Sequence, residues 1–169
     1  HPYNKIPELS DNIKGVILSG SPFSVRDEHA PMPNLEGIKG VFPLLGVCYG
    51  AQYLAKVSGG EVLPSKIREY GRANLSFVNS SNPLLEGILE GSQVWMSHGD
   101  TITTLPDDFE IITSTETVQV AGYQITKEKT FAIQFHPEVY HSTDGKQLLS
   151  NFLVNICDCS QDWTADSFV

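Results

Sequence analysis

A short apolar run that ends in a glycine-flanked cysteine constrains the fold of this chain more than any other stretch. Residues 44–47 (Leu-Leu-Gly-Val) predict a buried strand, and a helical pattern follows Cys48 directly. The pattern Gly-x-Cys-x-Gly is the cysteine form of the nucleophile elbow, in which a strand turns tightly into a helix. Gly46 and Gly50 remove the Cβ atoms that would collide in such a turn. The stretch therefore predicts an α/β fold with a strained, exposed nucleophile at the end of a strand.

The position of Cys48 at the start of a helix predicts its chemistry. Free N–H groups and the positive end of the helix dipole favour the thiolate over the thiol there. The N–H group of Tyr49, the next residue, points to where the oxyanion of a tetrahedral intermediate would form. A cysteine at a strand end can also be a small buried core residue without chemistry. The catalytic interpretation therefore depends on a base elsewhere in the chain.

Length and charge exclude several classes of protein. At 169 residues the chain is predicted to form one domain with a substantial core. The net charge is −9 and there is no basic tract, so we expect neither a nucleic-acid nor an anionic-membrane surface. No apolar run approaches the roughly 20 residues needed to span a bilayer. Three cysteines, an odd number, do not form a secreted disulfide framework, and we expect a cytoplasmic location.

Strand and helix patterns alternate early in the chain, and strand patterns dominate later. The expected strands are 15–19, 44–47, 61–63, 73–78, 93–96, 109–113, 118–125 and 130–135, and the expected helices are 34–40, 50–58, 83–86 and 145–156. This order predicts a three-layer α/β/α domain with a mainly parallel central sheet and a β-rich insertion.

A histidine at the end of a second predicted strand supplies the base. The strand 131–135 runs into His136, Pro137 and Glu138. The carboxyl end of a parallel strand is where open α/β sheets carry their sites, and Pro137 biases His136 toward an extended conformation. Glu138 can then accept the Nδ1–H of His136, which leaves the other ring nitrogen to face Cys48. This is a nucleophile, base and orienting carboxylate, although His-Pro-Glu can also be a plain exit from a strand.

The other titratable residues receive lesser roles. His98, with Asp100 two residues away, and His141 are rival bases, which we assign to substrate or supporting contacts. His1 and His29 are expected on the surface. Cys157 and Cys159 have the wrong spacing for a zinc site and are also expected on the surface. No metal site and no glycine-rich nucleotide motif is recognisable, so no cofactor is expected in this domain.

These motifs together resemble those of the class I, triad-type glutamine amidotransferases. Within that family they are most similar to the amidotransferase domain of the GMP synthetases, and the similarity covers nearly the whole chain. The segments that carry it are Leu18-Ser19-Gly20-Ser21-Pro22-x-Ser24-Val25, Gly46-Val47-Cys48-Tyr49-Gly50-x-Gln52, Trp95-Met96-Ser97-His98-Gly99-Asp100, His136-Pro137-Glu138-Val139-x-His141, the helix Gly145-x-x-Leu148-Leu149-x-Asn151-Phe152 and the exit Cys157-x-Cys159-x-x-x-Trp163.

The resemblance implies a flavodoxin-like fold and a residue-by-residue assignment of roles. Cys48 is the nucleophile that forms a γ-glutamyl thioester, His136 the general acid and base, and Glu138 its orienting partner. The N–H groups of Ser21 and Tyr49 are the implied oxyanion donors. The implied glutamine-binding residues are Gly20, Gln52, Ser97, His98, Gly99 and Asp100, with Asp100 placed to meet the α-amino group. Ser21 stands where the family usually has glycine, and a positive φ there would be strained.

The resemblance also implies partners that this chain does not contain. Residues 1–157 would form the glutaminase domain, without the family's first strand and helix, and residues 158–169 would begin a linker to an ATP-pyrophosphatase domain. That domain would use ATP, Mg²⁺ and the released ammonia to convert XMP to GMP, and the full-length protein would be a homodimer. The alternatives are the glutaminase of anthranilate, CTP or carbamoyl phosphate synthesis, and a related α/β cysteine hydrolase.

Overall fold

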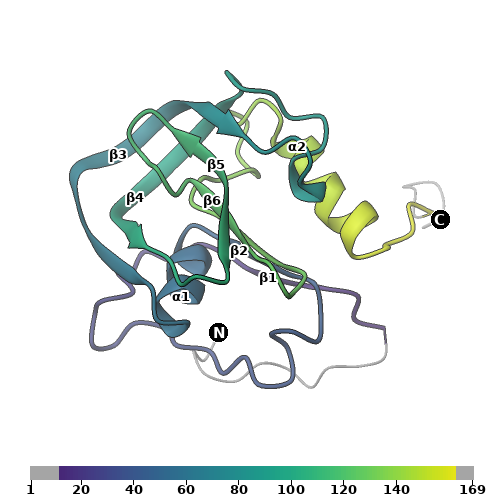
Figure 1. Cartoon of the computed structure of the whole chain (residues 1–169), viewed down its shortest axis with the longest axis horizontal. Helices are drawn as coiled ribbons and strands as arrows, with labels where there is room; N and C mark the ends of the chain where they lie inside the picture. Colours follow the sequence, from purple (N-terminus) through teal and green to yellow (C-terminus); the bar gives the residue numbers. More distant parts are fainter. Residues whose placement is uncertain (1–11, 163–169) are drawn as a thin grey trace, which may run out of the picture.

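The computed structural model describes residues 12–162, except the side chains of residues 66–69, and places a curled sheet between helices (Figure 1). Within these residues the strands are β1 (Val16–Leu18), β2 (Leu44–Val47), β3 (Glu61–Val78), β4 (Gln93–Thr104), β5 (Phe109–Thr115), β6 (Gly122–Ile125) and β7 (Thr130–Ile133). The helices are α1 (Tyr49–Val57), the 3₁₀ turn η1 (Pro83–Leu85) and α2 (Gly145–Ser150), which continues as the π-helix η2 (Asn151–Ile156). The predictions for residues 1–11 and 163–169, including His1, lie outside the described residues.

The sheet has a parallel part and an antiparallel part. Its strand order is β1-β2-β7-β6-β5-β3-β4, in which β1, β2 and β7 are parallel neighbours and the remaining pairs are antiparallel. The predicted β-rich insertion is therefore β3 to β6, which extends the sheet beyond β7. Because β2 and β7 are adjacent and parallel, the residues that follow them leave the sheet at the same edge.

Two apolar clusters lie on opposite faces of the sheet and confirm the three-layer prediction. Along β2, Leu44 belongs to the cluster that contains Leu54 of α1, whereas Leu45 belongs to the cluster that contains Phe152 of η2. Alternate residues of a strand point to opposite faces, so each cluster belongs to one face. Figure 1 shows α1 beside β1 and β2, with α2 and η2 away from it on the right. Residues 44–47 are all buried because both faces are covered.

Several expected elements differ from the structure, among them the strand expected at 118–125, which begins only at Gly122. The helix expected at 34–40 is wrong, since residues 36–41 form successive turns. Gly37 and Gly40 there have φ values of 75° and 76°, which a right-handed helix cannot accommodate. The strands expected at 61–63 and 73–78 are the two ends of the single long strand β3. It pairs with β4 between Glu61 and Asn74, with a register shift between Pro64 and Glu69, and its last residues pair with β5. Every helix in residues 12–162 is too short or too polar to span a membrane.

Candidate active site

The backbone at Cys48 has the strained elbow shape that the glycine pattern predicts. Cys48 directly precedes α1 with φ 52° and ψ −104°, a rare conformation for a residue with a side chain, and its N–H donates to the Ile133 carbonyl of β7 (2.8 Å). A Cβ on Gly50 would lie 2.3 Å from the Leu18 carbonyl oxygen, and a Cβ on Gly46 would lie 2.9 Å from the Gly50 oxygen. Strands β1 and β2 therefore approach the start of α1 so closely that only glycine fits.

The thiol of Cys48 is buried and its pKa is raised, whereas the sequence predicted an exposed nucleophile with a favoured thiolate. The residue is 5% exposed, and its Sγ donates a long hydrogen bond to the Ser97 carbonyl oxygen (3.7 Å). Burial raises the pKa of the Cys48 thiol to about 11, with an opposing contribution from the Tyr49 N–H and a further raising one from the Glu138 charge. The cost of removing the thiolate from water therefore outweighs the stabilisation that the N–H groups at the start of the helix give it. A base must remove the proton before the sulfur can attack.

His136, the base that the sequence predicts, lines the same cavity as Cys48. Its Nδ1 lies 2.7 Å from a carboxylate oxygen of Glu138, which holds the ring from one side. The backbone of His136 is fixed as well, because its N–H donates to the Trp95 carbonyl (2.9 Å) and its carbonyl accepts from the Ser142 hydroxyl (2.5 Å). With Nδ1–H bonded to Glu138, the tautomer leaves a lone pair on Nε2. His136 is thus oriented by a carbonyl of β4 and by Glu138 and Ser142, which follow His136 in the chain.

Gly20, in the loop after β1, marks the space that Cys48 and His136 share. A Cβ built on Gly20 would lie 3.8 Å from both Cys48 Cβ and His136 Nε2, and 3.1 Å from His136 Cε1. The ring nitrogen that does not contact Glu138 and the Cβ of Cys48 therefore border the same small space beside Gly20. The structure brings the elbow, the histidine and the loop after β1 together beside Gly20.

One cavity of about 1000 Å³ connects these groups. All the predicted site residues line it, and they are Gly20, Ser21, Cys48, Tyr49, Gln52, Ser97, His98, Gly99, Asp100, His136 and Glu138. Ser21 does not have the positive φ that would have strained it, and its hydroxyl accepts from the Phe23 N–H (3.3 Å). His141 is absent from the cavity lining and stacks on Trp95, with ring centroids 4.7 Å apart.

A buried amide chain, which the sequence analysis missed, supports the cavity wall. Gln52 of α1 donates from Nε2 to the Asp100 carbonyl (2.9 Å) and to Oε1 of Gln134 (3.2 Å). Gln134 is fully buried and donates to the Val120 carbonyl (2.9 Å). The Gln52 amide therefore positions the Asp100 backbone. A glutamine inside the apolar run 131–135 was the available signal for this contact.

A second contact that sequence reasoning missed involves Asp100 itself. Its carboxylate accepts hydrogen bonds from the Ser24 hydroxyl and from Nε of Arg26 (3.3 Å), and Nη2 of Arg26 also lies 3.3 Å away. Both partners come from the loop after β1, 74 and 76 residues away in the sequence. No spacing pattern links such distant positions.

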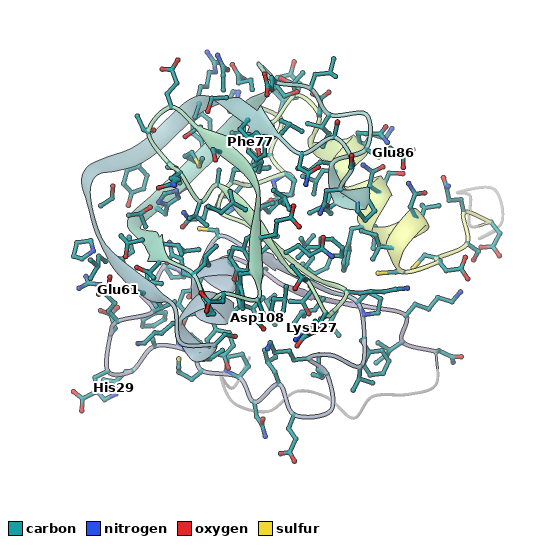
Figure 2. All side chains as sticks on the ribbon, viewed as in Figure 1. His29, Glu61, Phe77, Glu86, Asp108 and Lys127 are labelled. Carbon is teal, nitrogen blue, oxygen red and sulfur yellow. The ribbon has the colours of Figure 1, made fainter. Side chains whose placement is uncertain are left out.

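Of the residues predicted to lie on the surface, His29 does so and Cys157 does not. His29 is exposed at the edge of the molecule, as Figure 2 shows. Cys157 is buried, which contradicts its prediction, because it packs under Gly15, whose Cβ would lie 2.4 Å from the sulfur. Cys159 is partly buried. Among residues 12–65 and 70–162, no cluster of three histidine, cysteine, aspartate or glutamate residues could hold a metal ion.

Comparison with known proteins defines the class to which this fold and site belong. The family described as glutamine amidotransferase class-I matches residues 1–156, and the chain belongs to that family. Its curated relatives include the glutamine-hydrolysing GMP synthases of Cytophaga hutchinsonii (62% identical over 169 residues) and Phocaeicola vulgatus (58% over 168 residues). The matches cover 100% and 99% of this chain but 33% and 32% of those proteins, so the chain spans about a third of their length.

A solved structure agrees with this assignment. A Thermoplasma acidophilum protein, assigned as one of the subunits of a GMP synthase, superposes with a TM-score of 0.72 at 32% sequence identity. The superposition covers 88% of this chain and 74% of that protein. The fold class predicted from the sequence is therefore confirmed.

Proposed function

We propose that this chain is the glutaminase part of a GMP synthase, in which Cys48, His136 and Glu138 form the catalytic triad. The observation that carries the proposal is the placement of the His136 ring. One ring nitrogen lies 2.7 Å from Glu138. The other would lie 3.8 Å from a Cβ built on Gly20, and the same Cβ would lie 3.8 Å from Cys48 Cβ. The match to glutamine-hydrolysing GMP synthases over the full length of the chain supports the assignment.

The first half of the reaction follows from the protonated thiol. His136 Nε2 takes the proton of Cys48, and the sulfur attacks the side-chain amide carbon of glutamine. The resulting oxyanion accepts hydrogen bonds from the backbone N–H groups of Tyr49 and Ser21. The imidazolium, stabilised by the Glu138 carboxylate, then gives its proton to the leaving nitrogen. The C–N bond breaks, and ammonia leaves a γ-glutamyl thioester on Cys48.

The second half regenerates the enzyme with the same groups. His136 takes a proton from water, the hydroxide attacks the thioester carbon, and the C–S bond breaks. The proton returns to the sulfur, so the cycle ends with glutamate and the neutral thiol that burial favours. The cavity residues Gly20, Gln52, Ser97, His98, Gly99 and Asp100 surround the substrate in this scheme.

The ammonia is used by another part of the protein. In the proposed domain arrangement residues 1–157 form the glutaminase, and residues 158–169 lead toward a covalently linked synthetase domain. That domain would bind ATP, Mg²⁺ and XMP and aminate XMP to GMP, in a cytoplasmic, homodimeric enzyme. The curated relatives support this arrangement, because about two thirds of their length lies outside the match to this chain.

Paired assays on the full-length protein test the proposal. Cys48→Ala should abolish GMP formation from glutamine, XMP and ATP, but retain GMP formation when ammonium replaces glutamine. His136→Asn should lose nearly all glutaminase activity. Glu138→Gln should lower the glutaminase rate by about 10²–10³-fold, because orienting the base contributes less than transferring the proton. A glutamine-like diazoketone should label Cys48, and the control Cys157→Ala should be labelled like the wild type. Glutamine-dependent activity in Cys48→Ala would refute the triad.

A further inference from the structure

Arg26 is a charged residue of the cavity to which the proposed reaction gives no role. It lies in the loop after β1 and lines the same cavity as Cys48. Among the described residues that line this cavity, it is the only arginine or lysine. Glutamine enters with a negative α-carboxylate, which needs a cationic or N–H partner when it leaves water. A guanidinium suits this task because its planar fork can donate two parallel hydrogen bonds to a carboxylate.

The contacts of Arg26 leave its guanidinium free to bind a second carboxylate. The Arg26 side chain is 43% exposed, whereas that of its partner Asp100 is 9% exposed. Both guanidinium contacts go to one oxygen of Asp100, at 3.3 Å each, and the other oxygen accepts from Ser24. Both guanidinium contacts are long, and the Arg26 side chain is well exposed to water, which weakens its attraction to the carboxylate. The arginine can therefore reorient at low cost while the buried carboxylate stays in place.

The loop that carries Arg26 is held against the protein by its own polar contacts. The Ser24 hydroxyl accepts from the Arg26 N–H (3.1 Å), and the Ser24 N–H donates to the Asp27 carboxylate (2.9 Å). Val25 is fully buried, and its carbonyl accepts from the Lys56 ammonium group of α1. The backbone at Arg26 is thus fixed at the wall of the cavity before any substrate binds, which reduces the entropy cost of binding.

We propose that Arg26 binds the α-carboxylate of glutamine through its guanidinium, beside Asp100, to which the family resemblance already assigns the α-ammonium group. The proposal rests on the proposed glutaminase function and adds a residue that selects an α-amino acid. The two opposite charges of the pair match the two charges of the substrate. An amide that lacks either charge would leave one member of the pair without its substrate partner, so the enzyme would reject it.

Three amides distinguish this role from a structural one. The full-length protein is assayed with L-glutamine, with L-glutamine α-amide, which lacks the carboxylate, and with glutaramate, which lacks the ammonium group. The wild type should prefer L-glutamine over either analogue by about 100-fold in kcat/KM. Arg26→Gln should raise KM for L-glutamine about 30- to 100-fold with little change in kcat, and leave kcat/KM for the α-amide nearly unchanged. Asp100→Asn should instead lose the preference over glutaramate.

The controls separate the possible outcomes. Arg72→Gln, an exposed arginine of β3 that does not line this cavity, should leave all three rates unchanged. Arg26→Lys keeps the charge without the fork, and its KM should lie between those of the wild type and Arg26→Gln. Equal losses toward L-glutamine and the α-amide in Arg26→Gln, or no loss at all, would overturn the proposal. A wild-type protein that neither hydrolyses L-glutamine nor reacts with the diazoketone at Cys48 would overturn the proposed function and this proposal with it.

Discussion

Substitution of Gly20 by alanine should damage the reaction without damaging the fold. The added Cβ would lie 3.1 Å from His136 Cε1, whereas carbon atoms in contact are normally about 3.5–4.0 Å apart. The ring or the loop must therefore give way by about half an ångström. Since a 1 Å misplacement can cost about 10²-fold in rate, we expect kcat/KM for glutamine to fall about tenfold, or about 1.4 kcal/mol of barrier. Gly20 does not have a positive φ, so alanine fits its backbone.

The assay compares glutamate release with the urea midpoint of unfolding. Gly20→Ala should keep the wild-type midpoint, because the residue is exposed. Gly50→Ala is the matched contrast, since its Cβ would lie 2.3 Å from the Leu18 carbonyl oxygen, and it should lower the free energy of unfolding by about 1–3 kcal/mol or more. Wild-type kcat/KM in Gly20→Ala would refute the argument that Cys48 and His136 need this space, and a lowered midpoint would show that the loss comes from the fold.

Two further predictions concern the buried groups of the site. Iodoacetamide should alkylate Cys48 about tenfold faster for each pH unit between 7 and 9, because the thiolate reacts and burial raises the pKa of the thiol to about 11; a rate that stays flat over this range would contradict the neutral thiol. Gln134→Leu should lower the free energy of unfolding in urea by about 1–3 kcal/mol, since the Val120 carbonyl loses its donor. The exposed Gln119→Leu is its control, and equal midpoints for the two variants would show that the buried contact contributes nothing.

The sequence by itself determined the features that depend on neighbouring residues. The elbow at Cys48 could be predicted because Gly46 and Gly50 lie within two residues of it, and steric exclusion acts over that distance. The contact between His136 and Glu138 could be predicted for a similar reason, since an extended His-Pro-Glu step places both side chains on one side. The buried run at 44–47 indicated a strand covered on both faces, and the structure confirms it.

Only the tertiary structure decided what depends on distant segments. Burial raises the pKa of Cys48, and the walls of its cavity come from the loop after β1, from β4 and from the residues that follow β7. No local sequence pattern reports the desolvation that such distant segments cause together. The pairing of Arg26 with Asp100 and that of Gln52 with Gln134 join positions 74 and 82 residues apart. Local periodicity reports which face of an element is buried, whereas the partner across the cavity depends on strand order and register. Whether a polar side chain faces a charge, an amide or water is therefore settled when the sheet assembles.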